Sequence, residues 1–172
     1  PEDIAVLYRA NFQSRALEEA FLLMEIPYQV LGVRFFERRV VNYILSFIRA
    51  GLNPDSLSDI KRIIDCPPRG IGKTTLVKMF AKDEASLPPL AQKRVADFYK
   101  LLDDIKNFAL TEKTSKLIQF VSEKTGIEAS LKTEHDEDLE RLENIHELVT
   151  LATKYDILPP EEAVEKLLGD AA

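Results

Sequence analysis

A short run of glycine, lysine and threonine residues, Gly70-Ile71-Gly72-Lys73-Thr74, has the residue types and the spacing to bind phosphate. Its end, Gly-Lys-Thr, matches the end of the nucleotide-binding P-loop, in which backbone amides wrap the phosphates. The full P-loop pattern requires a glycine at the position of Pro67, which has a fixed φ and no amide hydrogen. A P-loop also follows a strand, whereas residues 58–64 have the apolar period of a helix. Both departures argue against a nucleotide site.

The same run also matches a helix–hairpin–helix, in which a tight glycine-containing turn joins two helices. Its two glycines permit unusual backbone angles and let a phosphate come close to the chain. The first amides of the following helix form an anion site, where Arg69 and Lys73 add charge and Thr74 can donate a hydroxyl. We expect Ile71 to fill a small core between the helices. From spacing alone, a helix connection without any ligand is an equal alternative.

The charge of the chain is unevenly distributed. The net charge of −6 argues against a general nucleic-acid-binding coat. Residues 1–80 contain 11 Lys and Arg against 9 Asp and Glu, whereas residues 81–172 contain 12 against 20. Within residues 60–78, Asp65 is the one acidic residue among five basic ones, which are Lys61, Arg62, Arg69, Lys73 and Lys78. This local excess could hold a few phosphates or form a solvated helix face.

A second candidate site lies near the N-terminus, at Tyr8 and Arg9. They follow a short apolar run that is predicted to be a buried strand, and open α/β sheets bind ligands at the carboxyl ends of their strands. Tyr8 could stack on a base and Arg9 could contact a phosphate. The alternative is a packing tyrosine beside a surface charge, which the residues taken alone favour.

Composition limits the remaining possibilities. The chain of 172 residues is 45% hydrophobic and 30% charged, as in proteins that bury a core. One cysteine, Cys66, cannot form an internal disulfide, which fits a reducing compartment, and two histidines predict no metal site. The apolar runs are too short to span a bilayer. Because the first residue is Pro1, we expect a piece excised from a longer protein.

The predicted fold is mainly α, with a small βαβ remnant at the N-terminus. Strands are expected at residues 4–8 and 28–31, on either side of a helix that Asn11 caps and that ends near Glu25. From Arg34 onward the apolar residues recur at the helical period as far as the C-terminus. A βαβ unit requires neighbouring strands, which the rest of this chain does not offer.

Four motifs resemble the UvrD/PcrA/Rep family of superfamily 1 DNA helicases. Residues 4–15 resemble helicase motif IV, and residues 26–28 and 34–38 resemble the passage from motor domain 2A into the inserted domain 2B. Residues 68–72, Pro-Arg-Gly-Ile-Gly, resemble the element that contacts duplex DNA. Residues 141–148, Arg-Leu-Glu-Asn-Ile-His-Glu-Leu, match a signature late in 2B. Together the motifs cover most of the chain, in the order and spacing of the family.

The resemblance implies a domain boundary and a parent activity. Residues 1–33 would be a remnant of the RecA-like domain 2A, and residues 34–172 the helical accessory domain 2B. In the whole motor, which uses ATP and Mg²⁺, Tyr8 would stack on adenine and Arg9 would contact the γ-phosphate. The parent would be a cytoplasmic bacterial helicase that unwinds DNA from 3′ to 5′ in repair or replication.

The resemblance also implies how this part binds DNA. The phosphates of duplex DNA near a single-strand/double-strand junction would lie against Gly70, Ile71, Gly72, Lys73 and Thr74, with Arg69 beside them. Other partners would be the rest of the motor and repair or replication proteins, and no membrane. Within residues 141–148 and just after them we expect a structural role, in which Leu142, Ile145, Leu148 and Val149 fill the core.

Two departures and one absence qualify this picture. Val33 stands where the family commonly has a second glycine, and residues 39–42 lack the family's acidic, lysine-containing stretch, so a hinge here is in doubt. The P-loop, the magnesium-holding motif and the arginine finger lie outside the sequence, so we expect no ATP hydrolysis by this chain. The alternative function is a helical protein-interaction module with an acidic docking surface and no DNA binding.

Overall fold

The computed structural model of the chain describes residues 4–8, 13–29, 34–131 and 135–171, and within these ranges it contains helices and no β-strand. The predicted, mainly α-helical fold is therefore confirmed. The helices of the described part are α1 (Ser14–Leu23), η2 (Phe35–Glu37), α2 (Arg39–Leu52), α3 (Leu57–Ile63), α4 (Lys73–Phe80), η3 (Glu84–Ser86), α5 (Pro89–Thr111), α6 (Thr114–Lys124), α7 (Ile127–Ser130), α8 (Asp136–Ala152), η4 (Thr153–Tyr155) and α9 (Pro160–Asp170).

The predicted N-terminal strands are not formed in the described residues. Residues 4–8 have no regular structure, and their apolar side chains are open to solvent, with Ile4 77% and Leu7 92% exposed. Residues 28 and 29 also lack strand structure, and residues 30 and 31 of the second predicted strand lie outside the described part. A strand requires a partner for its backbone groups, and no strand of the described residues supplies one. Within the described residues, the predicted buried βαβ unit is thus replaced by an exposed segment without regular structure, residues 4–8, and by helix α1.

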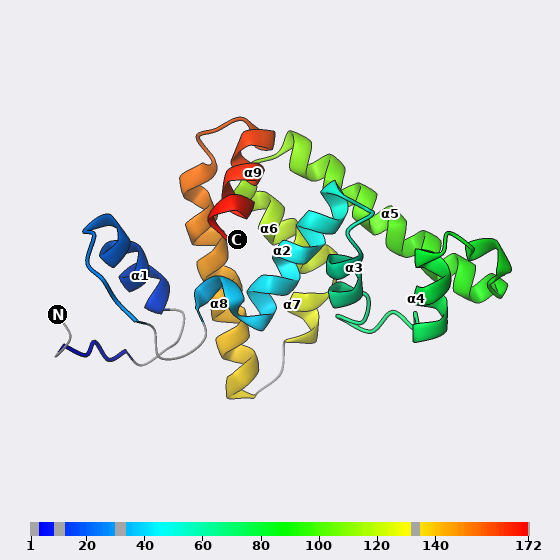
Figure 1. Ribbon diagram of the computed structural model, residues 1–172, viewed down its shortest axis with the longest axis horizontal. Helices are drawn as coiled ribbons and strands as arrows, with labels where there is room; N and C mark the ends of the chain where they lie inside the picture. The colour runs from blue at the N-terminus through cyan, green and yellow to red at the C-terminus, as the bar shows by residue number, and fades with distance from the viewer. Residues whose placement is uncertain (1–3, 9–12, 30–33, 132–134, 172) are drawn as a thin grey trace.

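Helix α2 forms the centre of the fold and contacts α3, α5, α6 and α8 (Figure 1). Helix α2 buries an apolar stripe of Val40, Ile44, Phe47 and Ile48, which agrees with the helical apolar period predicted from Arg34 onward. At the end of α2, a Cβ on Gly51 would lie 3.1 Å from the carbonyl oxygen of Leu102 in α5. Glycine at this position therefore permits the close approach of the two helices.

Helices α5 and α8 complete the core on two sides of α2. From α5, the side chains of Val95, Phe98, Leu102 and Ile105 are buried, while Leu101 is only partly buried. From α8, the core contains Ile145 and Leu148, with Leu142 and Val149 packed partly buried against it. The amino-terminal half of α5 extends from this core and, with α4 and η3, forms the end of the molecule opposite the N-terminus (Figure 1).

Polar contacts attach α1 to the helical body. The buried guanidinium of Arg38 donates to Asn144 Oδ1 in α8 at 2.7 Å and to the hydroxyl of Ser14 in α1 at 2.6 Å. Arg15 of α1 forms an ion pair with Glu147 of α8. The motif around residues 141–148 therefore does more than fill the core, since two of its polar side chains hold the N-terminal helix. Sequence reasoning did not predict this junction.

None of the described helices is both long enough and apolar enough to cross a membrane.

Candidate nucleic-acid interface

The Gly-Ile-Gly turn lies on the surface, between the chain that follows α3 and the start of α4. Residues 57–63 before it are helical and residues 64–68 form turns, so no strand precedes it in this described stretch. This is the context of a connection between helices and not that of a P-loop. Gly70, Gly72, Lys73 and Thr74 are exposed, whereas the Ile71 side chain is 2% exposed.

The burial of Ile71 shows how the turn is anchored. Its side chain is part of the buried core that also contains Ile60 and Ile63 of α3 and Met79 of α4, so it faces inward as expected. Whether it fills a separate core between α3 and α4 stays a prediction. With this side chain inside, Ile71 can offer a ligand only its backbone. The exposed glycines on either side leave that backbone accessible.

The two glycines have different roles. Gly70 has a φ of +66°, a left-handed conformation that residues with a Cβ rarely adopt. Gly72 has ordinary extended angles, with a φ of −81°, and a Cβ built on it would meet nothing within 4 Å. Gly70 is therefore needed for the path of the chain, whereas Gly72 leaves open space in front of the backbone.

Helix α4 begins at this open space without a side-chain cap. Gly72 is the N-cap residue, and its carbonyl accepts the first helical hydrogen bond from the amide of Leu76 at 3.0 Å. The first amides of a helix have no partner within it, and no side chain of the turn satisfies them. Lys73 and Thr74 carry exposed side chains at these positions. The arrangement can hold an anion, to which Lys73 adds a full positive charge.

Arg69 was predicted to lie beside a bound phosphate, but its guanidinium points into the protein. It donates to the carbonyl oxygens of Pro67 at 2.8 Å, Ile63 at 3.3 Å and Thr125 at 3.0 Å. It also lies over the ring of Phe47, 5.2 Å from the centroid. Burial lowers the pKa of the guanidinium. Arg69 thus holds the turn from within, and sequence alone could not give the direction of its side chain.

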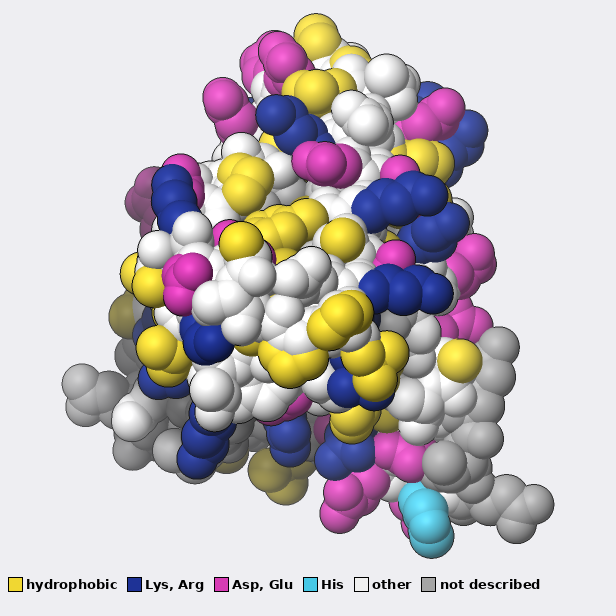
Figure 2. Space-filling view, turned by 90° about the vertical axis from the view of Figure 1, so that its right-hand side faces the viewer, with side chains coloured by type: hydrophobic (Ala, Val, Ile, Leu, Met, Phe, Trp, Pro, Cys, Tyr) yellow, Lys and Arg dark blue, Asp and Glu magenta, His cyan; other side chains and the backbone are white. Residues whose placement is uncertain are grey.

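Other cations of the predicted basic patch, residues 60–78, are also engaged in contacts within the protein. Arg62 donates to Ser46 and Asn42 of α2, and Lys78 donates to the carbonyl of Ser86 at 3.2 Å. Figure 2 shows this end of the molecule, where Lys and Arg side chains are interspersed with acidic and hydrophobic ones. The face therefore offers individual cations and not a continuous basic surface. Lys73 is the cation of the patch that lies at the start of α4 itself.

One contact at the turn was missed by sequence reasoning. Arg94 of α5 donates from Nη1 to the carbonyl oxygen of Gly70 at 2.9 Å. The two residues are 24 positions apart, and no motif links them. Only the packing of α5 beside the turn reveals that they meet.

The described residues do not assemble a nucleotide site at the second candidate position. Tyr8 is 37% exposed in a segment without regular structure, and Arg9 lies outside the described residues. One exposed aromatic ring on such a segment can neither enclose a base nor neutralise a triphosphate. Within the described ranges, no group of three or more His, Cys, Asp or Glu side chains could hold a metal ion.

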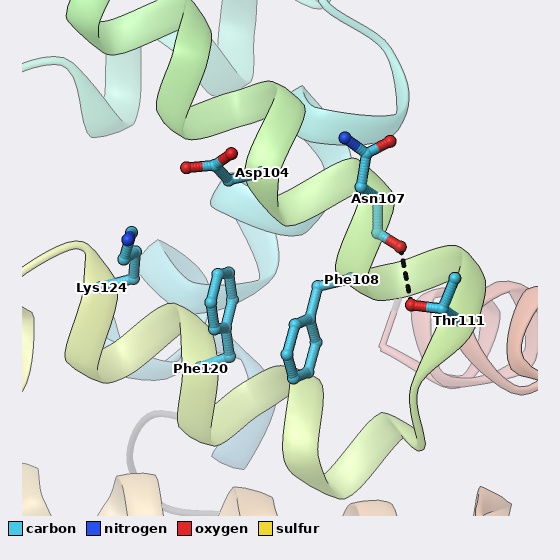
Figure 3. Close-up of a pocket in the computed structure, with 6 residues that line it drawn as sticks. All are labelled: Asp104, Asn107, Phe108, Thr111, Phe120 and Lys124. Carbon is cyan, nitrogen blue, oxygen red and sulfur yellow. Dashed lines mark hydrogen bonds between the residues drawn. The ribbon is translucent and has the colours of Figure 1, made fainter.

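A separate hollow lies between α5 and α6, at the other end of α5 from Arg94. It has a volume of about 420 Å³ and is lined by Asp104, Asn107, Phe108, Thr111, Phe120 and Lys124 (Figure 3). The rings of Phe108 and Phe120 stack at 4.2 Å with an angle of 7° between their planes. This contact packs α5 against α6, and no residue of the Gly70–Gly72 turn lines the hollow.

The sequence of the chain is similar to those of known DNA helicases. A family model described as the UvrD-like helicase C-terminal domain matches residues 1–171. The ATP-dependent DNA helicase UvrD1 of Mycobacterium bovis is 33% identical over 173 residues, which cover 89% of this chain and 22% of that protein. The ATP-dependent DNA helicase PcrA of Staphylococcus aureus is 31% identical over 178 residues, which cover 94% of this chain and 24% of that protein.

The chain thus spans about a quarter or less of the length of the curated relatives it matches. The match runs through all four motifs from which the family resemblance was predicted, and that prediction is confirmed. The chain belongs to the family of UvrD-like helicase C-terminal domains.

Proposed function

We propose that this chain binds the phosphate backbone of duplex DNA through the Gly70–Gly72 turn and the start of α4. The observation that carries the proposal is the open space at Gly72, where a Cβ would meet nothing within 4 Å, directly before an uncapped helix. A phosphate oxygen can reach the backbone there, and Lys73 lies beside it. Such contacts fix the position of a duplex without reading its sequence.

The DNA-binding residues of this proposal are fewer than the sequence suggested. Gly70 shapes the turn, Gly72 leaves the space, and Lys73 and Thr74 supply a charge and a hydroxyl. Ile71 contributes its backbone alone. The inward contacts of Arg69 make it the support of this surface and not one of its phosphate ligands.

The wider role follows from the family. We propose that residues 34–172 are the accessory domain 2B of an ATP-dependent DNA helicase and that residues 1–33 belong to motor domain 2A. The parent would unwind DNA from 3′ to 5′ near a single-strand/double-strand junction, in the bacterial cytoplasm, with repair or replication proteins as further partners. Its ATP and Mg²⁺ would be held chiefly by motifs outside this sequence, with Tyr8 and Arg9 as contributors to ATP binding.

A direct test compares the affinity of the chain for duplex DNA with that of Lys73→Glu. We expect Lys73→Glu to abolish binding, because it places a negative charge where a phosphate would lie. Lys166→Glu makes the same change on exposed α9, far from the turn, and should bind nearly as the unchanged chain does. Equal binding by the chain and Lys73→Glu would contradict the proposal and favour an acidic protein-interaction module.

The proposal also expects that this chain alone does not hydrolyse ATP. Phosphoryl transfer requires a phosphate-binding loop, a metal site and charge-stabilising groups in one place. A phosphate-release assay with ATP and Mg²⁺ should give the rate of a protein-free blank. Metal-dependent hydrolysis that is lost in Lys73→Ala would contradict this expectation and restore the P-loop interpretation of Gly-Lys-Thr.

A further inference from the structure

We propose that Arg94 is a positioning residue of the phosphate-binding turn, a role that rests on the proposed function of that turn. Arg94 lies on α5, and its Nη1 donates to the carbonyl oxygen of Gly70 at 2.9 Å. Its side chain is otherwise exposed, so the contact is made at the surface and not in the core. An arginine that reaches across from another helix to one turn carbonyl restricts the orientation of that peptide group.

The guanidinium also lies directly against the α-carbon of Gly70. A Cβ built on Gly70 would be 2.7 Å from Nη1 and 2.8 Å from Cζ of Arg94, both inside contact distance. The φ of +66° disfavours a side chain at Gly70, and a side chain there would also displace the guanidinium of Arg94 from its present place. The flat guanidinium fits this space, which the tetrahedral ammonium of a lysine would not cover in the same way.

The contact determines where the next amide points. The peptide bond between Gly70 and Ile71 is trans, since Cys66–Pro67 is the cis bond of the described residues. In a planar trans peptide the C=O and N–H groups point in opposite directions. Because the Gly70 carbonyl is directed at Arg94, the Ile71 amide is directed away from α5. Arg94 thus orients the first peptide group of the turn that leads to Gly72 and α4.

Two arginines consequently support the turn from opposite sides. Arg69 holds the preceding residues from within, through the carbonyl oxygens of Ile63 and Pro67. Arg94 holds Gly70 from the solvent side. Both contacts are made by side chains, and they add to the support that the burial of Ile71 gives the turn. A pre-ordered turn binds a phosphate without first losing conformational entropy.

The test compares duplex binding by Arg94→Ala, Arg94→Lys and the matched control Lys93→Ala. Lys93 is the exposed neighbour on the same helix, and its removal also deletes one positive charge. A positioning role predicts that both Arg94 variants lose about fivefold or more in affinity, as expected for one hydrogen bond to a charged group. Lys93→Ala should lose less than about twofold. Arg94→Lys with unchanged affinity, or equal losses in Arg94→Ala and Lys93→Ala, would overturn the proposal.

A second measurement without DNA separates positioning from simple charge. Amide hydrogen exchange at Ile71 and Gly72 should become faster in Arg94→Ala and stay unchanged in Lys93→Ala. Unchanged exchange in Arg94→Ala would contradict the positioning role. If Lys73→Glu does not weaken duplex binding, the proposed function fails, and this inference with it. If Lys73→Glu abolishes binding while Arg94→Ala binds normally, only this inference is wrong.

Discussion

Arg69 donates a hydrogen bond of 3.0 Å to the carbonyl oxygen of Thr125, a residue 56 positions later at the end of α6. The same guanidinium donates to the carbonyls of Ile63 and Pro67, before the Gly-Ile-Gly turn. One side chain thereby connects the segment that leads into the Gly70–Gly72 turn to the helical body. The turn is thus tied to the core behind it, while the space in front of Gly72 stays open.

We predict that Arg69→Ala lowers the free energy of unfolding by about 2–4 kcal/mol, because three partly enclosed carbonyl groups lose a charged donor. Urea unfolding followed by circular dichroism measures this change. Arg69→Lys should recover little of the loss, since the compact ammonium lacks the planar fork whose two nitrogens reach these carbonyls. A loss below about 0.5 kcal/mol, as for a surface substitution, would show that the inward contacts contribute little.

The two glycines of the turn should respond differently to alanine. Gly70→Ala forces a residue with a Cβ into a φ of +66° and against Arg94, and should cost about 1–2 kcal/mol of unfolding free energy. Gly72→Ala meets open space and should change stability by less than about 0.5 kcal/mol. Denaturant unfolding of both variants measures these values.

Duplex binding should separate Gly72 from a merely structural position. The added methyl group of Gly72→Ala occupies the space that a phosphate would fill, so affinity should fall about threefold to tenfold, although the fold is intact. Fluorescence anisotropy with a labelled duplex measures this loss. If Gly72→Ala bound duplex DNA as tightly as the unchanged chain, the phosphate would not approach the backbone at that position.

We predict that the free energy of unfolding decreases at alkaline pH because of Tyr155. Burial, together with the hydrogen bond that its hydroxyl donates to Asp170 at 2.5 Å, raises the pKa of Tyr155 well above its ordinary value of 10.0. As pH rises, Tyr155 therefore loses its proton in the unfolded chain before it does so in the folded chain. Its contribution to the free energy of unfolding is full below pH 10 and is lost as pH rises towards the folded pKa. Urea unfolding at pH 8 and pH 11 should show a smaller decrease for Tyr155→Phe than for the unchanged chain. Equal decreases would mean that Tyr155 does not ionise on unfolding.

The sequence predicted those features that depend on local chemistry. The apolar period of residues 40–48 determined which face of α2 is buried, because the hydrophobic effect acts on that period directly. Glycine at positions 70 and 72 predicted the turn, and the apolar Ile71 between them predicted its anchor. In each case the residue type itself, glycine in a turn or an apolar side chain in the core, favours its environment without the help of residues distant in the sequence.

Features that depend on distant partners could not be predicted. An arginine has a long, flexible side chain, and nothing near Arg69 in the sequence shows whether it faces solvent or the carbonyl of Thr125. Arg94 approaches the turn only because α5 packs beside it. The apolar run at residues 4–8 has strand propensity, but without a neighbouring strand among the described residues it has no regular structure and is exposed.

The most direct test of the account is the salt dependence of duplex binding by the chain and by Lys73→Ala. Each phosphate neutralised by a cation adds about 0.9 to the slope of log affinity against log salt concentration. We predict that binding weakens steeply as salt rises, and that Lys73→Ala lowers the slope by about 0.9 while Lys166→Ala leaves it unchanged. Identical slopes for the chain and Lys73→Ala, or binding that salt does not affect, would contradict a phosphate site at the start of α4.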